Sequence, residues 1–178
     1  MAAGFDKDCK VLGSVLNLGF GFVTGGTVTL ASRPGNPKPR VIRLVDKKAV
    51  MNSMGFPGQG LEPAVKRLSK SQKHKRRVLV SISGTIEDEI FECLRQTQSL
   101  VSGLELNISS PNTAGLRIFH EPARLRGLIE GLAAEKIVPL FVKLPPWHRD
   151  EDSRRKLLKL ADTAVDAGVD GLVIANTH

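Results

Sequence analysis

A short stretch, residues 104–117 (LELNISSPNTAGLR), carries several side chains that could do chemistry. Its alternating leucine and isoleucine residues predict a buried strand, and the Ser-Ser-Pro-Asn-Thr run that follows is typical of a loop. Asn107 lies at the end of that strand, and Ser110 and Arg117 follow it. Enzymes of the α/β class often build sites where a strand delivers polar side chains to a loop. No histidine stands beside Ser110 to activate it, so the residues alone favour a turn role as readily as a catalytic one.

The elements that would position these residues alternate between strand and helix. Short apolar runs of this kind are buried on both faces, which indicates a parallel sheet. No glycine-rich phosphate motif opens a helix, so a (β/α)8 barrel fits better than a nucleotide-binding fold. Thr85 and Asp88 resemble a capping box at the start of one helix. The expected strands are 21–30, 78–83, 103–108, 138–144 and 171–175, and the expected helices begin near 11, 61, 86, 122 and 152.

The length of the chain limits how much of a barrel it can form. A complete (β/α)8 barrel needs about 250 residues, and the chain has 178. We therefore expect an α/β fold that is a partial TIM barrel. Residues 31–60 contain four prolines and a short apolar run, PRVIRL. They predict a small insertion of strand and loop.

The carboxyl ends of all strands in such a barrel open on one face. Amide side chains there match the edge of an imide or heterocycle, and lysines suit a carboxylate, a phosphate or charge on a reduced ring. There is no carboxylate pair for glycoside hydrolysis and no cluster for a metal, so we expect no metal site. The side chains expected around this mouth are Lys7, Thr27, Ser81, Asn107, Lys143, Asn176 and Thr177.

The composition is that of an ordinary globular protein, with 41% hydrophobic residues and a net charge of +8. The charge fits either an anionic partner or a basic solvated surface. The basic cluster at 73–77 has no interleaved aromatic residues, so we expect no nucleic-acid binding. Cys9 and Cys93 predict neither a disulfide nor a zinc site. Residues 11–32 lack charge but include five glycines and several polar residues, so we expect a soluble chain without a membrane span there.

Seven segments, in order and spacing, resemble the dihydroorotate dehydrogenase family. NISSPNTAGLR at 107–117 is the most specific of them. Serine at position 110, where cytosolic relatives and the dihydropyrimidine dehydrogenase domain carry cysteine, is similar to the quinone-linked class 2 enzymes. Dihydrouridine synthases share the fold and the flavin but not this loop. The other matching segments are AAGFDK at 2–7, GGTVT at 25–29, GNPKPR at 35–40, NSMGF at 52–56, FVKLPP at 141–146 and NT at 176–177.

The resemblance implies an FMN-dependent barrel that oxidises dihydroorotate to orotate in de novo pyrimidine synthesis, with a quinone as final acceptor. Ser110 would be the base that removes the C5 proton, with Thr113 and Phe56 along its proton path. The implied substrate contacts are Lys7, Asn52, Ser53, Met54, Gly55, Phe56, Asn107, Asn112, Asn176 and Thr177. The implied FMN contacts are Ala3, Gly4, Phe5, Asp6, Lys7, Thr27, Ser81, Asn107, Lys143 and Ala175.

Two residues depart from the family pattern. Ser81 stands where an asparagine is usual and Ala175 where a threonine is usual, so flavin affinity or potential is expected to differ. By resemblance, residues 1–178 would be an incomplete domain that runs from the end of the first barrel strand to the sixth. The quinone-binding helices and the glycines that hold the FMN phosphate would lie outside this chain.

Several expectations follow about partners and place. Dihydroorotate and orotate would bind here, and the quinone site would be missing. Membrane association, at the mitochondrial inner membrane or the bacterial cytoplasmic membrane, would belong to the full-length parent, while the fragment itself would be soluble. The alternative is a truncated, non-catalytic partial barrel that associates through two open sheet edges. A basic nucleic-acid-binding protein is a third reading, supported only by the net charge and by the basic cluster at 73–77.

Overall fold

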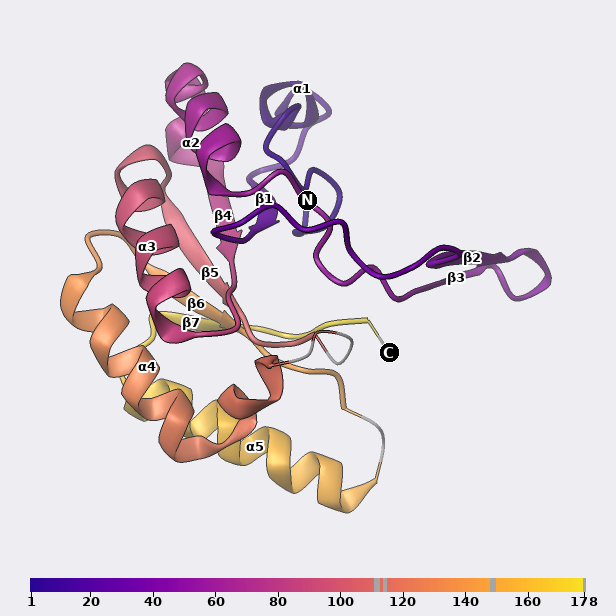
Figure 1. Ribbon diagram of the computed structural model, residues 1–178, viewed down its shortest axis with the longest axis vertical. Coiled ribbons are helices and arrows are strands. Elements are labelled where there is room, and N and C mark those ends of the chain that lie inside the picture. Colours follow the sequence, from indigo (N-terminus) through magenta and orange to yellow (C-terminus); the bar gives the residue numbers. More distant parts are fainter. Residues whose placement is uncertain (111–112, 114, 148–149, 178) are drawn as a thin grey trace.

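Five parallel strands form the body of the sheet in the computed structural model, which describes residues 1–110, 113, 115–147 and 150–177. The strand order is β1-β4-β5-β6-β7, and each neighbouring pair is parallel (Figure 1). The order follows the chain, as in a barrel wall. The strands are β1 (Val23–Val28), β4 (Val78–Ile82), β5 (Gly103–Asn107), β6 (Leu140–Lys143) and β7 (Gly171–Val173), which confirms the expected strands with shorter ends.

The helices lie between these strands in the sequence, and the longer ones cover the outer side of the sheet (Figure 1). Pro122 begins one of them, where its missing N–H costs nothing, and Gly168, with φ of +95°, follows the last. They are α1 (Leu12–Leu16), α2 (Leu61–Lys70), α3 (Glu87–Thr97), α4 (Pro122–Glu135) and α5 (Glu151–Asp166). Short 3-10 turns are η1 (Val45–Lys47), η2 (Gln72–Arg77), η3 (Gln98–Leu100) and η4 (Leu116–His120).

The start of α3 differs from the expected capping box. Ile86 is the residue that precedes the helix, and its side chain makes no capping hydrogen bond. The carboxylate that reaches back belongs to Glu89, which accepts a 2.8 Å hydrogen bond from Thr85 N. The Thr85–Asp88 assignment was wrong because the helix begins one residue later than the spacing suggested.

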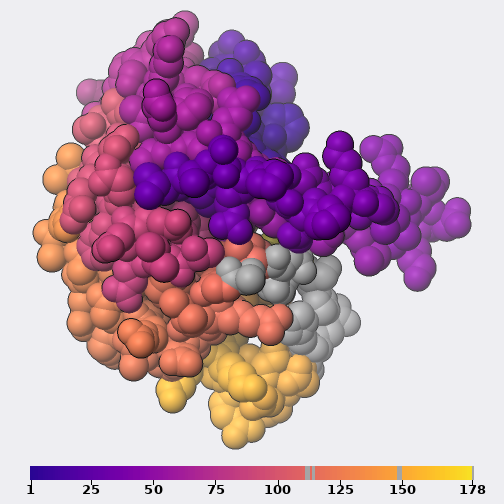
Figure 2. All heavy atoms as spheres, in the orientation of Figure 1, coloured from indigo at the N-terminus to yellow at the C-terminus, as the bar shows by residue number. Residues whose placement is uncertain are grey.

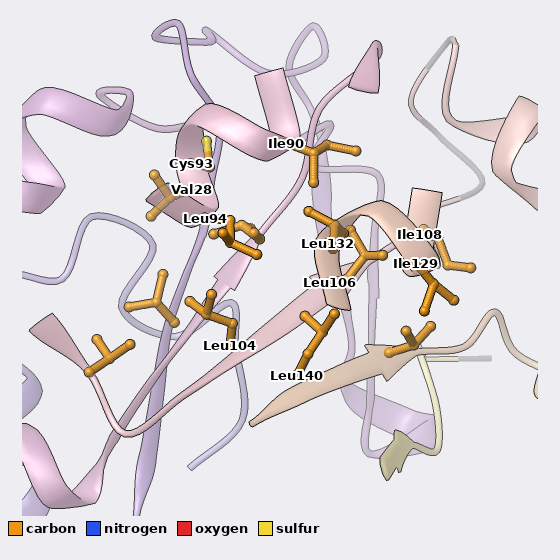
Figure 3. Close-up of a cluster of buried hydrophobic side chains, with 14 of the residues drawn as sticks. Val28, Ile90, Cys93, Leu94, Leu104, Leu106, Ile108, Ile129, Leu132 and Leu140 are labelled. Carbon is orange, nitrogen blue, oxygen red and sulfur yellow. The ribbon is translucent and has the colours of Figure 1, made fainter. Parts of the chain in front are cut away.

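Leucine and isoleucine side chains from alternate strand positions form the core between sheet and helices (Figure 3). Leu104 and Leu106 of β5 are fully buried there beside Ile90 and Leu94 of α3. Because side chains alternate along a strand, Glu105 and Asn107 point to the opposite face, the barrel interior. The apolar face thus fixes which residues of β5 can reach a site.

The expected insertion at 31–60 is an ordered β-hairpin that projects from the body (Figures 1 and 2). Its strands β2 (Val41–Leu44) and β3 (Ala49–Asn52) pair antiparallel. Backbone hydrogen bonds between Arg33 and Gly58, of 2.9 and 3.0 Å, tie its two ends together. The sequence predicted the first of these strands but not the second.

The edge of the sheet at β1 is covered by the first residues of the chain. Gly4 N donates to Gly26 O at 2.8 Å, Gly26 N donates to Asp6 O at 2.9 Å, and Thr24 N donates to Met1 O at 2.9 Å. This edge is therefore covered, in contrast to the two open edges that the truncated-barrel alternative assumed. Within the described part of the chain, no helix combines the length and the apolar character that a bilayer crossing requires.

Candidate active site

A cavity of about 590 Å³ opens at the carboxyl ends of the strands, between the N-terminal loop and the base of the hairpin. The strand ends supply Thr27, Asn107, Lys143 and the 175–177 segment to its wall. Most of the residues predicted for the site meet here. They are Ala3, Gly4, Lys7, Thr27, Asn52, Met54, Gly55, Phe56, Asn107, Ser110, Lys143, Ala175, Asn176 and Thr177.

The Asn107 side chain is held by hydrogen bonds on both ends of its amide. Its Nδ2 donates to Thr27 Oγ1 at 2.8 Å, and its Oδ1 accepts from Ser109 N at 3.0 Å and from Ser109 Oγ at 2.7 Å. Asn176 Nδ2 donates to the Ser109 carbonyl at 3.0 Å, which ties the last strand's loop to the same segment. These bonds fix the amides that face the cavity before any ligand binds.

Ser110 lies in the cavity wall with its hydroxyl oxygen 3.0 Å from that of Thr113. The side chain is 7% exposed. A serine hydroxyl can remove a proton only if its own proton moves on to another group. The Thr113 hydroxyl is placed to receive it.

Two lysines, Lys7 and Lys143, give the cavity a positive character, and none of the described residues in its wall is an aspartate or glutamate. Burial lowers the pKa of Lys7; Asp8 opposes that shift, while Arg40 and Lys143 add to it. Lys7 Nζ also donates to the Gly4 carbonyl. A half-buried cation near other cations gains most from an anionic ligand.

A tight backbone at Gly26 brings Thr27 into this wall. Gly26 has φ of +101°, and a Cβ there would lie 2.5 Å from the Ser81 carbonyl oxygen. The register between β1 and β4 shifts at this point. Only glycine fits this bend.

The family model for dihydroorotate dehydrogenase matches residues 1–178, the whole chain. The chain belongs to the dihydroorotate dehydrogenase family. Its similarity to the quinone-linked "Dihydroorotate dehydrogenase (quinone)" of Halorhodospira halophila is 40% identity, over 99% of this chain and 55% of that protein. The mitochondrial "Dihydroorotate dehydrogenase (quinone)" of Cyclocybe aegerita is 38% identical, over 99% of this chain and 57% of that protein.

A solved structure of DHODH from Eimeria tenella, in complex with ferulenol, superposes with a TM-score of 0.87 at 30% identity. The superposition covers all of this chain and 56% of the Eimeria chain. This agreement confirms the partial α/β barrel and the family resemblance. The chain spans about half the length of the curated relatives it matches.

Four residues predicted from the dihydroorotate dehydrogenase resemblance lie outside the cavity wall, and Asn112 falls outside the described residues. Phe5 is exposed. The Asp6 carboxylate accepts from Lys10 N at 2.8 Å and Val11 N at 2.7 Å, so it holds the N-terminal loop. Ser53 serves the hairpin base through its backbone, with Ser53 N donating to Arg40 O at 3.0 Å. Ser81 is fully buried, with its Oγ 3.0 Å from Thr27 Oγ1.

The hairpin adds wall residues that the sequence did not indicate. Val50, Met51 and Pro57 line the cavity beside Asn52. Gly55 has φ of +69°, and a Cβ there would lie 2.5 Å from Asn36 Oδ1, so the turn after β3 depends on this glycine. The apolar residues Val50 and Met51, directly before Asn52, were the sequence feature that could have indicated these wall residues.

Proposed function

We propose that this chain forms the substrate and flavin face of a dihydroorotate dehydrogenase, which oxidises dihydroorotate to orotate in de novo pyrimidine synthesis. FMN would be the hydride acceptor and a quinone the final acceptor. Because quinones are lipid-soluble, the whole protein would work at a membrane, the mitochondrial inner membrane or the bacterial cytoplasmic membrane. The observation that carries the proposal is one cavity in which Asn107, Ser110 and Lys143 meet, with no carboxylate among the described residues of its wall.

The donor set of the cavity fits a flavin. The cavity has a volume of about 590 Å³, and its wall carries positive charge together with ordered amides and hydroxyls. Such a cavity matches the planar polar ring of a flavin and the anionic form that the ring takes when reduced. Ala3, Gly4, Lys7, Thr27, Asn107, Lys143 and Ala175 would hold it. When bound, FMN supplies the acceptor for the hydride that leaves C6 of dihydroorotate.

Substrate recognition would rest on paired amides and a cation. Asn52, Asn107, Asn176 and Thr177 offer donors and acceptors that match the imide edges of dihydroorotate. Lys7 would bind the substrate carboxylate, because its charge is poorly solvated in the half-buried loop. Met54, Gly55 and Phe56 would close the cavity over the ring.

Ser110 would act as the base. Its oxygen takes the C5 proton while its own hydroxyl proton passes to Thr113 Oγ1, 3.0 Å away. Thr113 in turn releases its own hydroxyl proton along the path past Phe56 to solvent, so neither hydroxyl keeps an extra proton. The C5–H electron pair then forms the new C5–C6 double bond as the C6 hydride leaves. Water is kept out because Ser110 and Thr113 are both buried.

The test is the rate at which dihydroorotate reduces the flavin in the flavin-loaded protein. Ser110→Ala should lower that rate by ~10²-fold or more while flavin binding stays close to that of the unchanged protein. Ser110→Cys keeps an ionisable group and should retain part of the rate. Ser14→Ala, at an exposed position of α1, is the control. An unchanged rate in Ser110→Ala would rule out the base assignment.

A further inference from the structure

A buried carboxyl group, Glu105, lies in β5 on the same face of the sheet as Asn107. The side chain is 4% exposed. Among the described residues, its Oε1 is the one buried side-chain polar atom without a hydrogen-bond partner. Burying a carboxyl group costs free energy unless the group is well paired. A buried, incompletely paired carboxyl group that lies beside a binding cavity is a candidate for a functional role at that cavity.

Two hydroxyl groups connect Glu105 to the cavity. Ser81 of β4 is the residue directly opposite Glu105 of β5 in the parallel register, which places the Ser81 hydroxyl as the hydrogen-bond donor to the Glu105 carboxyl. Ser81 Oγ lies 3.0 Å from Thr27 Oγ1, which accepts a 2.8 Å hydrogen bond from Asn107 Nδ2. Thr27 and Asn107 line the cavity, whereas Ser81 and Glu105 are buried behind it.

The donor inventory gives this chain of bonds a direction. Asn107 Nδ2 can only donate, and each hydroxyl has a single proton. When Glu105 is a carboxylate, Ser81 donates to it, Thr27 donates to Ser81, and Asn107 donates to Thr27. A protonated Glu105 can instead donate to Ser81, and the constraint on the other bonds is released.

Charge links the same carboxyl group to the cavity. Burial raises the pKa of Glu105, while the Ser81 hydrogen bond and the positive charge of Lys143 lower it by smaller amounts. Lys143 lies two residues further along β6 than Phe141, which faces Glu105, and Lys143 itself faces Asn107. By the alternation of side chains along a strand, Phe141 and Lys143 are on the same face of β6. An anionic ligand that binds Lys143 in the cavity therefore changes the electrostatic environment of the Glu105 carboxyl.

We propose that Glu105 is a positioning residue of the cavity, which orients the Asn107 amide through Ser81 and Thr27 under the control of its own charge and of Lys143. The proposal rests on the proposed function only in taking Asn107 and Lys143 as ligand contacts. Glu105 itself is not among the described residues of the cavity wall. Its role is distinct from that of a buried core residue because it depends on pH.

The experiment is ¹H–¹⁵N NMR of the Asn107 side-chain amide in the 178-residue chain across a pH series. The Asn107 signals should shift with a single midpoint above that of an ordinary glutamate. Lys143→Gln should move the midpoint upward, since the charge that favours the carboxylate is gone. Glu105→Gln and Ser81→Ala should both abolish the shift.

Two controls separate this coupling from other titrations near β5. Glu62→Gln removes an exposed glutamate of α2 and should leave the Asn107 titration unchanged. His120→Gln removes an imidazole whose Nε2 lies 2.8 Å from the Ile108 carbonyl of the same segment, and the shift should persist.

Asn107 signals that stay constant with pH, or a shift that survives both Glu105→Gln and Ser81→Ala, would overturn the proposal. If Glu105→Gln does not fold, Ser81→Ala and Lys143→Gln still decide it. No ligand enters the measurement. A pH-coupled Asn107 in a protein whose flavin is not reduced by dihydroorotate would contradict the proposed function alone.

Discussion

The hydroxyl oxygens of Ser110 and Thr113 lie 3.0 Å apart, and both side chains are buried. Either hydroxyl can be the donor, so the pair can pass a proton in either direction. A serine alone cannot hold a substrate proton at neutral pH. If Ser110 is the base, as we propose, the pairing with Thr113 would supply the second group that it needs.

Removal of the Thr113 hydroxyl should slow proton removal without loss of shape. Thr113→Val is expected to reduce the rate of flavin reduction by dihydroorotate by ~10²-fold, because the Ser110 proton loses its acceptor. Thr113→Ser keeps the hydroxyl and should retain most of the rate. Stopped-flow absorbance of the flavin measures both. Equal losses in the two variants would show that the methyl group, and not the hydroxyl, matters.

The Lys143 ammonium should contribute to the binding of anionic ligands and reduced flavin. Lys143→Met is expected to weaken orotate binding by about tenfold, equivalent to roughly 1.4 kcal/mol, since a hydrogen bond to a charged group is lost. The effect should shrink as salt is added. Lys66→Met, an exposed position on α2, is the matched control in the same calorimetric titration. Similar losses in both variants would point to overall charge instead of a site contact.

Elements with a strong apolar pattern could be predicted from the sequence. The five strands and the long helices follow directly from runs such as Val78–Ile82 and from helical spacing, because burial of these residues dominates local preferences. The site residues at strand ends follow from the barrel geometry. Lys7, Asn107 and Lys143 do meet in one cavity, and their roles there stay a prediction.

Contacts made by backbone and by distant segments could not be predicted in this way. The Asp6 carboxylate accepts hydrogen bonds from the backbone N–H groups of Lys10 and Val11, which the residue type did not reveal, and the expected flavin contact of Asp6 stays a prediction. Ser81 faces Thr27 instead of the cavity, because the bend at Gly26 brings Thr27 over it. Such outcomes depend on backbone angles that residue types alone do not fix. The strand β3 was missed because its exposed residues show no burial pattern.

Gly26 and Gly127 allow a matched test of where the backbone requires glycine. Gly26→Ala should destabilise the protein and weaken ligand binding, because its Cβ would lie 2.5 Å from the Ser81 carbonyl at a positive φ. Gly127, in α4, has no atom within 4 Å of an added Cβ. Gly127→Ala should therefore stabilise the protein by about 0.5–1 kcal/mol through helix propensity. Denaturant unfolding measures both, and destabilisation by Gly127→Ala would contradict the account.

Asp170 should make stability fall in acid. Its Oδ2 accepts from Lys136 Nζ and, at 2.7 Å, from Leu140 N. These hydrogen bonds, Lys136 foremost, hold the pKa of Asp170 below its ordinary value of 3.8. The carboxylate therefore stabilises the fold above that value, and the contribution is lost as the pH falls toward the folded-state pKa.

Asp170→Asn should cost about 1 kcal/mol at neutral pH, a modest figure because the side chain is partly exposed to water. Chemical unfolding at a series of pH values measures the difference, which should shrink in acid as the native aspartate becomes protonated. Asp162→Asn, on the exposed face of α5, is the control and should change little. A loss in Asp170→Asn that stays constant from neutral pH to acid would mean that shape, and not charge, holds this connection between α4, β6 and β7.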